Sequence, residues 1–477
     1  MKNYKYIVVT VLSLFIFACS ADGYLEGLNK DTKNPSVGVP DELFFTNAEK
    51  ALIDKMSSIS INTSIFRFIT QYTSSPIYTQ ESQYNFRTRS ISGNHWTILY
   101  RDVLTDLRAA KSELLNSGNY VSPSELRIQK NRLAMVEVLE VYTFAVLVDT
   151  FGDIPFSEAL DINNVLPKYD DAATVHAELM SMVNHAISQF DTGAAGFGEA
   201  DLIYSGDIDS WIKFANSLKL RLAMTVGNAS AAAEAAPNVF SSNADNATLD
   251  YLSTSANANP LWNAIVESGR NDYIMANTIV DAMNSLEDPR RDVFFSNPID
   301  GSYVGGPYGA GGDFDTFSHF GEVFKQPTLP GNLLDYAEVS FMLAEAVERG
   351  YSVGGTAEEH YNNAIMASME YWGVDAADAA AYLSRPDVAY TSATGNYNEK
   401  IGTQMWIALF NRGFESWLHW RRYDYPILNA APTLTVDDIP VRMQYPIDEQ
   451  QRNPENRAAA ASAIGGDELT TKLFWDN

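Results

Sequence analysis

Apolar residues recur every three or four positions along several long stretches of the chain, which is the spacing of a buried stripe on an amphipathic helix. The clearest stretch runs from Trp96 to Leu115. The stretch from Glu125 to Val148 becomes apolar on nearly all sides in its second half, so we expect that helix to lie at the centre of the fold. The same spacing predicts further helices over 172–190, 208–226, 333–348, 356–372 and 397–410.

Capping residues support these boundaries. Thr356 and Glu359 have the spacing of a capping box, and Gly227, Gly350 and Gly373 stand where helices commonly end. Helices of about 16 to 24 residues that follow one another as antiparallel pairs are typical of tetratricopeptide-like packing. We therefore predict an all-α fold, in which tetratricopeptide-like helical hairpins form a superhelical scaffold within a single domain over 41–477.

The helical spacing fails over residues 228–332, apart from a short periodic stretch at 273–286. This insert is rich in Asn, Ser, Gly, Pro, Tyr and Phe. A loop region of this length inside a compact domain is usually functional. We expect the insert to carry the ligand site.

The N-terminus has the features of a secretory signal peptide over residues 1–18. Lys2 and Lys5 precede an apolar run over 7–17, which is shorter than the roughly 20 residues that a membrane-spanning helix needs. The sequence Ile16-Phe17-Ala18-Cys19 resembles the lipobox of bacterial lipoproteins, so Cys19 is the predicted lipidation site and residues 19–40 the tether. Cys19 is the single cysteine of the chain, which excludes internal disulfides and cysteine-based metal sites.

Charge and histidine spacing exclude several classes of protein. The chain has 33 Lys and Arg against 60 Asp and Glu, a net charge of −27, so nucleic acid is not an expected partner. The six histidines show no metal-ligand spacing, and no glycine-rich phosphate loop follows a strand. We predict no catalytic residue, no metal and no cofactor. The acidic surface also disfavours highly anionic polysaccharides, unless arginines such as Arg87 and Arg89 compensate locally.

Four phrases, in this order along the chain, resemble the SusD/RagB family. They are residues 149–156, residues 288–290 followed by 303–309, residues 413–422, and residues 442–446 with Glu449 and Asn453. The resemblance implies a glycan-binding lipoprotein of the Bacteroidetes outer membrane that faces the cell exterior. It also implies docking on a SusC-like TonB-dependent transporter, with irregular loops carrying the ligand site.

Two of these phrases also have a plain structural interpretation. Gly152 and Pro155 break a helix, while Asp149 and Asp153 can cap and turn the chain, so the first phrase predicts a corner, with a calcium site as the alternative. In the third phrase, the spacing predicts an ion pair between Glu415 and the arginines at 421 and 422, across a bend of the helix.

A neutral sugar offers an apolar C–H face and a ring of hydroxyl groups, so its site needs aromatic platforms beside polar side chains. The insert supplies both kinds, and in the resembled family the loop ahead of residue 96 also contributes to the sugar site. The alternative interpretation is that about half of these aromatic residues only cover the helices beneath them. Trp96 itself also fits a core stripe. The candidate ligand-binding residues are Trp262, Tyr303 and Tyr308, then Arg270, Asn271 and Tyr273, and from the earlier loop Tyr78, Tyr84, His95 and Trp96.

Two other functions remain open on the sequence. An all-α glycoside hydrolase or polysaccharide lyase needs an acid and a base, and carboxylates are abundant in this chain. Such toroidal enzymes need about six hairpins spread along the chain, whereas the last clear helix pair here ends near residue 422. A peptide-capturing surface lipoprotein is the third possibility, because helical-repeat surfaces often bind peptides. We favour an oligo- or polysaccharide ligand, and among these a neutral glucan.

Overall fold

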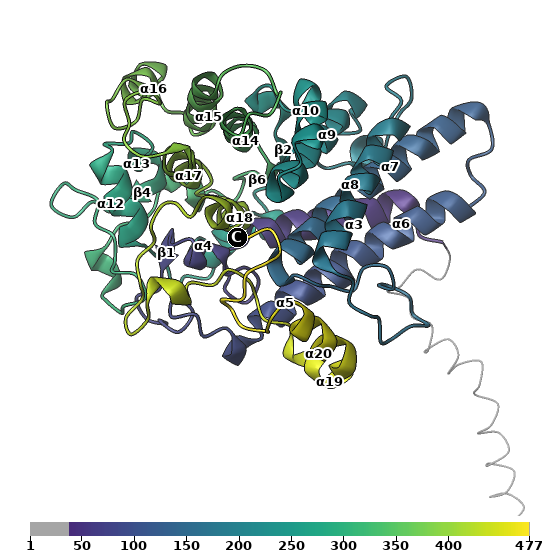
Figure 1. Cartoon of the computed structure of the whole chain (residues 1–477), viewed down its shortest axis with the longest axis horizontal. Helices are drawn as coiled ribbons and strands as arrows, with labels where there is room; N and C mark the ends of the chain where they lie inside the picture. The colour runs from purple at the N-terminus through teal and green to yellow at the C-terminus, as the bar shows by residue number, and fades with distance from the viewer. Residues whose placement is uncertain (1–37, 477) are drawn as a thin grey trace, which may run out of the picture.

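The structure, a computed structural model, describes residues 38–476 and consists mainly of helices (Figure 1). The signal peptide, Cys19 and most of the tether lie outside the described residues. The first half of the body contains α3 (Asp41–Ser57), α4 (Phe66–Ile69), α5 (Ile91–Thr97), the π-helix η3 (Ile98–Leu104), α6 (Thr105–Asn116), α7 (Pro123–Phe151), α8 (Ala172–Gln189) and α9 (Ile208–Val226). The second half contains α14 (Tyr336–Glu348), α15 (Ala357–Tyr371), α16 (Ala376–Leu383), α17 (Tyr397–Ala408), α18 (Gly413–Tyr423), α19 (Ile447–Arg452) and α20 (Pro454–Ala463).

Neighbouring helices pack as hairpins, which confirms the predicted tetratricopeptide-like fold. Helix α7 packs against α8 and α8 against α9, while α14 packs against α15 and α17 against α18. Helix α3 packs against α6 and against the π-helix before it. Each predicted helix is present, and the stretch predicted from residue 96 begins earlier, at Ile91, because α5, the π-helix and α6 are continuous.

Local hydrogen bonds explain where the helices begin and end. Thr356 and Glu359 form the predicted capping box at the start of α15, and Ser122 and Glu125 form a second one at the start of α7. Gly227 ends α9 in the left-handed conformation at φ 71°, as predicted from its position.

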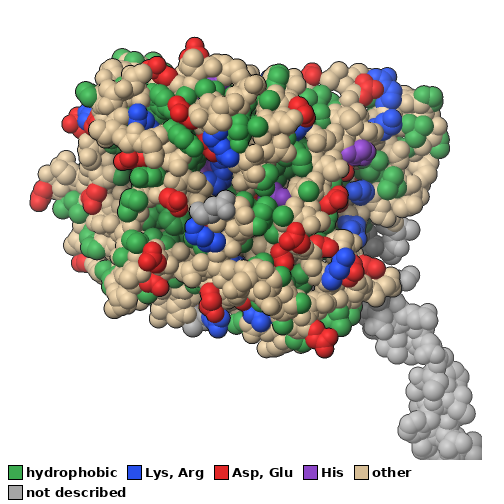
Figure 2. All heavy atoms as spheres, in the orientation of Figure 1, with side chains coloured by type: hydrophobic (Ala, Val, Ile, Leu, Met, Phe, Trp, Pro, Cys, Tyr) green, Lys and Arg blue, Asp and Glu red, His purple; other side chains and the backbone are tan. Residues whose placement is uncertain are grey.

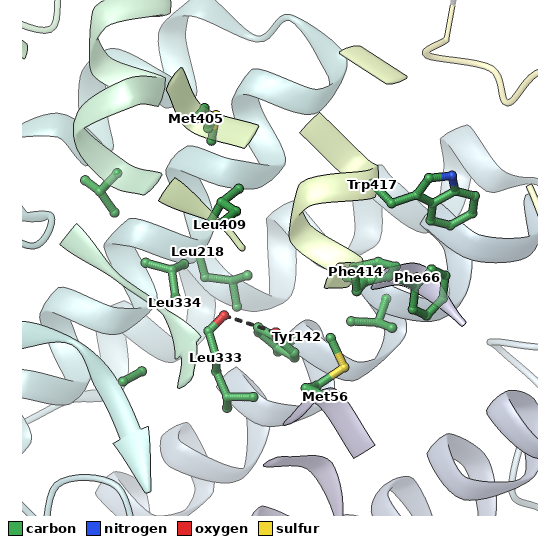
Figure 3. Close-up of a cluster of buried hydrophobic side chains, with 14 of the residues drawn as sticks. Met56, Phe66, Tyr142, Leu218, Leu333, Leu334, Met405, Leu409, Phe414 and Trp417 are labelled. Atoms are coloured by element: carbon green, nitrogen blue, oxygen red, sulfur yellow. Dashed lines mark hydrogen bonds between the residues drawn. The ribbon is translucent and has the colours of Figure 1, made fainter. Parts of the chain in front are cut away.

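One hydrophobic core extends through the body, and α7 lies at its centre as predicted. Nearly all side chains of α7 beyond residue 134 are buried. Figure 3 shows Tyr142 of this helix among core residues from both halves of the chain, with its hydroxyl oxygen 3.1 Å from the Leu333 carbonyl. Residues labelled with it in the figure include Phe66, Leu218, Met405 and Trp417. Helices from both ends of the sequence therefore share one core.

A buried ion network lies beside this core. Glu338 of α14 is within 2.7 Å of Arg221, 2.6 Å of Arg412 and 2.9 Å of His419. Burial alone would raise the pKa of Glu338, but the two guanidinium groups outweigh it and hold that pKa well below its ordinary value. The network ties α9, α14 and α18 together.

The ion pair predicted within the third phrase is wrong. Glu415 lies 3.7 Å from Arg412 and accepts a hydrogen bond from the Tyr142 hydroxyl at 2.6 Å. The two predicted partners point elsewhere, because Arg422 pairs with Glu345 at 2.6 Å and the guanidinium of Arg421 stacks 3.6 Å from the Trp417 ring centre. Glu415 therefore helps to fix α18 on α7, a role between helices that spacing within one helix does not reveal.

The first phrase forms the predicted corner between α7 and α8. Gly152 ends α7 at φ 85°, and the Asp153 carboxylate accepts a hydrogen bond from the backbone nitrogen of Ala172 at 2.9 Å. Ile154 and Asp170 then form an antiparallel bridge across the turn. The carboxylate thus orients the start of α8.

The insert covers one side of the scaffold with short elements. It contains α10 (Ala229–Ala235), β2 (Ala247–Leu249), α11 (Pro260–Trp262), the π-helix η8 (Asn263–Glu267), β3 (Ile274–Met275), α12 (Asn277–Ser285), α13 (Arg291–Phe294), β4 (Phe295–Ser296), β5 (His319–Phe320) and, at its end, β6 (Gly331–Leu334). Strand β1 (Thr73–Ser74), from the first part of the chain, pairs antiparallel with β3, so Thr73 faces Met275. This pairing joins the insert to the loop that follows α4.

Candidate functional site

The site that best combines aromatic and polar groups is a surface hollow of about 410 Å³ beside the β1–β3 pair. Three segments form its walls: the loop after α3, the loop after β1, and the insert from α11 to β3. The lining residues are Ser58, Ser60, Ile61, Asn62, Phe68, Ser75, Tyr78, Glu81, Arg89, Pro260, Asn263, Ala264, Ser268, Arg270, Asp272 and Tyr273. We call this hollow the loop pocket.

Two buried basic side chains hold the first wall of the loop pocket. Arg67 donates hydrogen bonds to the carbonyl of Ser57 at 3.1 Å and to that of Ser58 at 2.8 Å. Lys55 donates to the carbonyl of Thr63 at the other end of the same loop. Backbone carbonyls that would otherwise lack partners are satisfied in this way, so the serine- and asparagine-rich loop has a fixed conformation.

The second and third walls are fixed to each other by strand pairing. Ser75 directly follows β1, and its hydroxyl accepts a hydrogen bond from the backbone nitrogen of Tyr78 at 2.9 Å. On the insert side, Tyr273 directly precedes β3, and its ring packs edge-on against Phe68 at 6.1 Å. The π-helix η8 supplies Asn263 and Ala264, and single π turns of this kind are frequent at functional sites.

Tyr78 is the most exposed aromatic ring of the loop pocket, and two arginines flank it. The guanidinium carbon of Arg89 lies 5.6 Å from the ring centre and that of Arg270 lies 5.7 Å from it. Cations at this distance are attracted by the ring electrons. Together these side chains present an apolar face surrounded by N–H donors, which suits a ligand rich in hydroxyl groups.

Each arginine of the loop pocket has its own carboxylate. Arg89 lies 2.8 Å from Glu81, which is buried, and Arg270 lies 2.5 Å from Asp272. The two positive and two negative charges balance. The loop pocket therefore offers many hydrogen-bonding groups without a net charge, which favours neutral ligands over anionic ones.

Two further polar groups contribute to the site. The side-chain oxygen of Asn263, beside the hollow, is buried and accepts no hydrogen bond from the described residues. Burial raises the pKa of Tyr273 to about 12, which keeps its hydroxyl protonated at physiological pH. Its O–H can then act as a donor.

Three of the predicted ligand residues, Tyr78, Arg270 and Tyr273, line the loop pocket. Asn271 lies between two of the lining residues and is exposed, but it does not line the hollow itself. Trp262 is half-buried in α11, next to the lining residue Asn263. The structure thus brings together one group of the predicted residues.

Three other predictions are wrong, because the side chains are buried. Tyr308 is 3% exposed, Tyr84 is 7% exposed and His95 is 1% exposed. The Tyr308 hydroxyl donates to the Phe68 carbonyl at 2.7 Å, and the His95 ring packs edge-on against Phe66 at 5.2 Å. Buried rings offer no face to a sugar, so these residues support the scaffold.

The remaining candidates lie outside the loop pocket. The Tyr303 hydroxyl donates to Asp292 at 3.0 Å, and the ring packs against Phe295 at 5.5 Å. The half-buried Trp96 has its ring 4.8 Å from Tyr100 and 5.0 Å from Phe151, which agrees with its place on a core stripe. Neither residue contacts the hollow.

The first wall of the loop pocket and most of its charged residues were not predicted from the sequence. The missed lining residues include Ser58, Ser60, Asn62, Glu81 and Asn263. One signal was present: residues 58–64, directly after α3, are all Ser, Ile, Asn or Thr, a composition that supplies hydroxyl and amide groups on a turn. The side-by-side position of the two arginines has no sequence signal, because they lie 181 residues apart (270 − 89).

Other hollows have a different character. A polar one of about 380 Å³ lies where α9, α14 and α18 end, and its lining includes Glu345, Arg349 and Arg422, which already pair with one another. Within residues 38–476 no group of three or more His, Cys, Asp or Glu side chains could hold a metal ion. Among the helices described there, none is long and apolar enough to cross a membrane.

The fold and the loop pocket define a class: a helical-repeat scaffold that presents a small polar and aromatic hollow on inserted loops. Comparison with known families agrees. A family model described as SusD-like, starch-binding and associating with the outer membrane matches residues 33–446. The chain belongs to this SusD-like family. A search among curated proteins finds no match.

Solved structures with the same fold include several SusD homologues. A structure titled as a chitin-binding protein has 25% sequence identity and a TM-score of 0.78, and the match covers 91% of this chain and 99% of that one. A SusD homologue from Bacteroides uniformis, also 25% identical, has a TM-score of 0.74 with 91% and 99% covered. A chitin-binding SusD homologue from Flavobacterium johnsoniae has 23% identity and a TM-score of 0.77, with 91% and 98% covered. These similarities confirm the fold over nearly the whole body.

Proposed function

We propose that this protein captures neutral oligo- or polysaccharides at the cell surface through the loop pocket. The observation that carries the proposal is the combination of the exposed Tyr78 ring with two arginines that are each neutralised by a carboxylate. The family description as starch-binding, and the chitin-binding titles of two relatives, support a glycan built from uncharged units. Starch-type and chitin-type oligosaccharides are therefore the first ligands to test.

The direct test is isothermal titration with malto- and chito-oligosaccharides of increasing length. A shallow site of this kind should bind in about the micromolar to millimolar range. Tyr78→Ala should remove most of the affinity, because it deletes the exposed ring. Tyr303→Ala is the matched control, since it removes a half-buried tyrosine of the insert outside the loop pocket. Equal binding by both variants would place the site elsewhere.

The same incubation separates the alternative functions. A binding protein returns the oligosaccharide with unchanged chain length, whereas a hydrolase or lyase shortens it. In the loop pocket both carboxylates, Glu81 and Asp272, form ion pairs with arginines. This favours a role in orienting the guanidinium groups over a role as catalytic acid or base. A peptide-capturing protein would ignore the sugars and bind an unstructured peptide pool instead. We infer that the protein is not an enzyme.

We also propose that Cys19 carries the lipid anchor, that the chain is held on the exterior of the outer membrane, and that it passes its ligand to a SusC-like TonB-dependent transporter. The family description as associating with the outer membrane supports the location. Cys19→Ala should abolish partition into the detergent phase. Purification from native membranes in mild detergent should recover the transporter together with this chain, and loss of the transporter in every detergent would count against the partnership.

A further inference from the structure

One end of the body combines exposed aliphatic and basic side chains. We call it the hairpin end, and it consists of the start of α3, the end of α6, the loop 117–122 and the first turns of α7. Figure 1 shows these helices at one side of the molecule, and Figure 2 shows hydrophobic and basic side chains together at that side. Its exposed aliphatic residues are Leu43, Leu115, Val121 and Leu126, and its exposed basic residues are Arg108, Arg127 and Lys130.

Side-chain contacts show that these segments form one continuous surface. The Tyr120 hydroxyl, in the loop between α6 and α7, donates to Asp41 in the first turn of α3 at 3.0 Å. Arg132 of α7 lies 2.8 Å from the same carboxylate and 2.5 Å from Glu42. Val121, at the tip of the loop, is 77% exposed although its backbone nitrogen is bonded to Glu125 at 3.1 Å. The aliphatic side chains are therefore presented to solvent by an ordered loop.

This surface is less acidic than the protein as a whole. Residues 105–132 contain five Lys and Arg against three Asp and Glu, and Asp41 and Glu42 at the start of α3 bring the balance to zero, in a chain of net charge −27. The acidic groups that face this surface are mostly occupied: Asp41 and Glu42 pair with Arg132, and Asp191 pairs with Arg127. Within the described chain, Arg108 and Lys130 have no carboxylate within ion-pair distance, while Glu199 on the neighbouring 3-10 turn (Gly198–Ala200) is exposed.

The chain also enters the body at this surface. Asp41 begins α3, and Cys19 lies 22 residues before it (41 − 19), so a fully extended connection spans at most about 75 Å. Aliphatic side chains with flanking basic residues are the combination that binds anionic lipid interfaces. We propose that the hairpin end rests against the anionic lipid headgroups of the membrane to which the chain is anchored. This inference rests on the lipid anchor of the proposed function.

The orientation that follows is specific. The hairpin end faces the bilayer, and the α16 side of the body, which lies at the other side of the molecule in Figure 1, points away from it. Contact through Leu115, Val121 and Leu126 supplies an apolar component, while Lys130 and its basic neighbours supply an electrostatic one that weakens as salt is added.

The test uses the lipidated full chain in vesicles of phosphatidylethanolamine and phosphatidylglycerol with brominated acyl chains. Because lipid occupies Cys19, a newly introduced cysteine is the only free thiol and can carry a fluorophore. We compare Val121→Cys with Thr394→Cys, an exposed position in the loop between α16 and α17. Bromine should quench the label at 121 at least about threefold more than the label at 394, since insertion of the tip brings the fluorophore to the acyl region.

Charge reversal tests the electrostatic component. Lys130→Glu should reduce quenching of the label at 121 and weaken its salt dependence, whereas Arg452→Glu, an exposed arginine of α19, is the matched control and should change neither. Flotation of the same vesicles reports the anchor separately. A chain that floats but shows equal quenching at both labels overturns this inference alone, and a chain that does not float overturns the anchor as well. Quenching at 121 that requires a co-reconstituted transporter would assign the surface to that protein and also overturn the inference.

Discussion

Lys55→Met is the substitution that tests most directly how the scaffold fixes the loop pocket. Lys55 is buried at the end of α3, its ammonium lies 5.7 Å from the Phe66 ring centre, and it donates to the Thr63 carbonyl. Burial lowers the pKa of Lys55 from 10.5 to about 7. Half of these buried ammonium groups are therefore neutral near pH 7.

The sign of the pH dependence follows from this lowered pKa. Between pH 7 and pH 10.5 the unfolded chain keeps the Lys55 proton while the folded chain has lost it. Folding is then opposed by proton release, and the free energy of unfolding rises with pH through this window. At about 1.4 kcal/mol per pKa unit, the lysine costs about 4 kcal/mol at pH 7 and about 1.5 kcal/mol at pH 9.5. The free energy of unfolding should therefore rise by about 2 to 3 kcal/mol between these two pH values.

The assay is urea unfolding of the wild type, Lys55→Met and Lys50→Met at pH 7 and pH 9.5. The wild type and Lys50→Met, whose partly exposed ammonium pairs with Asp54 on the same helix, should both gain stability at the higher pH. Lys55→Met should lack that gain. It should also bind oligosaccharide more weakly, because the Thr63 carbonyl loses its donor and the first wall of the loop pocket loosens. An identical pH dependence in all three proteins would refute the reasoning.

Three other substitutions have defined outcomes. Tyr308→Ala should lower the free energy of unfolding by about 3 to 5 kcal/mol, as removal of a buried aromatic ring does, and thermal melting with circular dichroism checks this. Glu338→Gln should cost about 3 to 5 kcal/mol, because Arg221 and Arg412 stay buried without a counter-charge, and denaturant titration measures it. Asp272→Asn leaves Arg270 without its carboxylate, so the variant should gain affinity for uronic acid oligosaccharides in isothermal titration, whereas Asp250→Asn, outside the loop pocket, should not.

Helix positions and their ends could be predicted from the sequence because both depend on nearby residues. The spacing of apolar residues predicted α7, and the second half of this helix is buried as expected. The capping box of α15 needs only two residues three positions apart. The pairing of Glu415 could not be predicted in this way, because its partner Tyr142 belongs to a helix 273 positions away. The spacing of residues along the chain predicts a helix, but not which other elements its side chains contact.

The candidate site was predicted only in part for a similar reason. Tyr303 and Tyr308 were expected to be exposed on an irregular, glycine-rich loop, but here glycine permits close packing. A Cβ atom on Gly305 would lie 2.4 Å from the Cα atom of Asn277, and one on Gly309 would lie 2.7 Å from the side chain of Ala431. The loop therefore lies flat on the body and buries Tyr308. Composition alone does not distinguish a glycine that permits close contact from one that permits motion.

The β1–β3 pairing also has a consequence for how the protein matures. About 170 residues separate Arg89 from Pro260, the nearest lining residues on the two sides of the loop pocket, and closing so long a loop delays the contact during folding. During synthesis the N-terminus emerges first. The loop pocket therefore cannot be complete until the chain has emerged as far as residue 275. Until then the partly built walls expose Phe68 and its neighbours to solvent. Chaperones would meet the chain in this interval, and ligand could stabilise only the finished product.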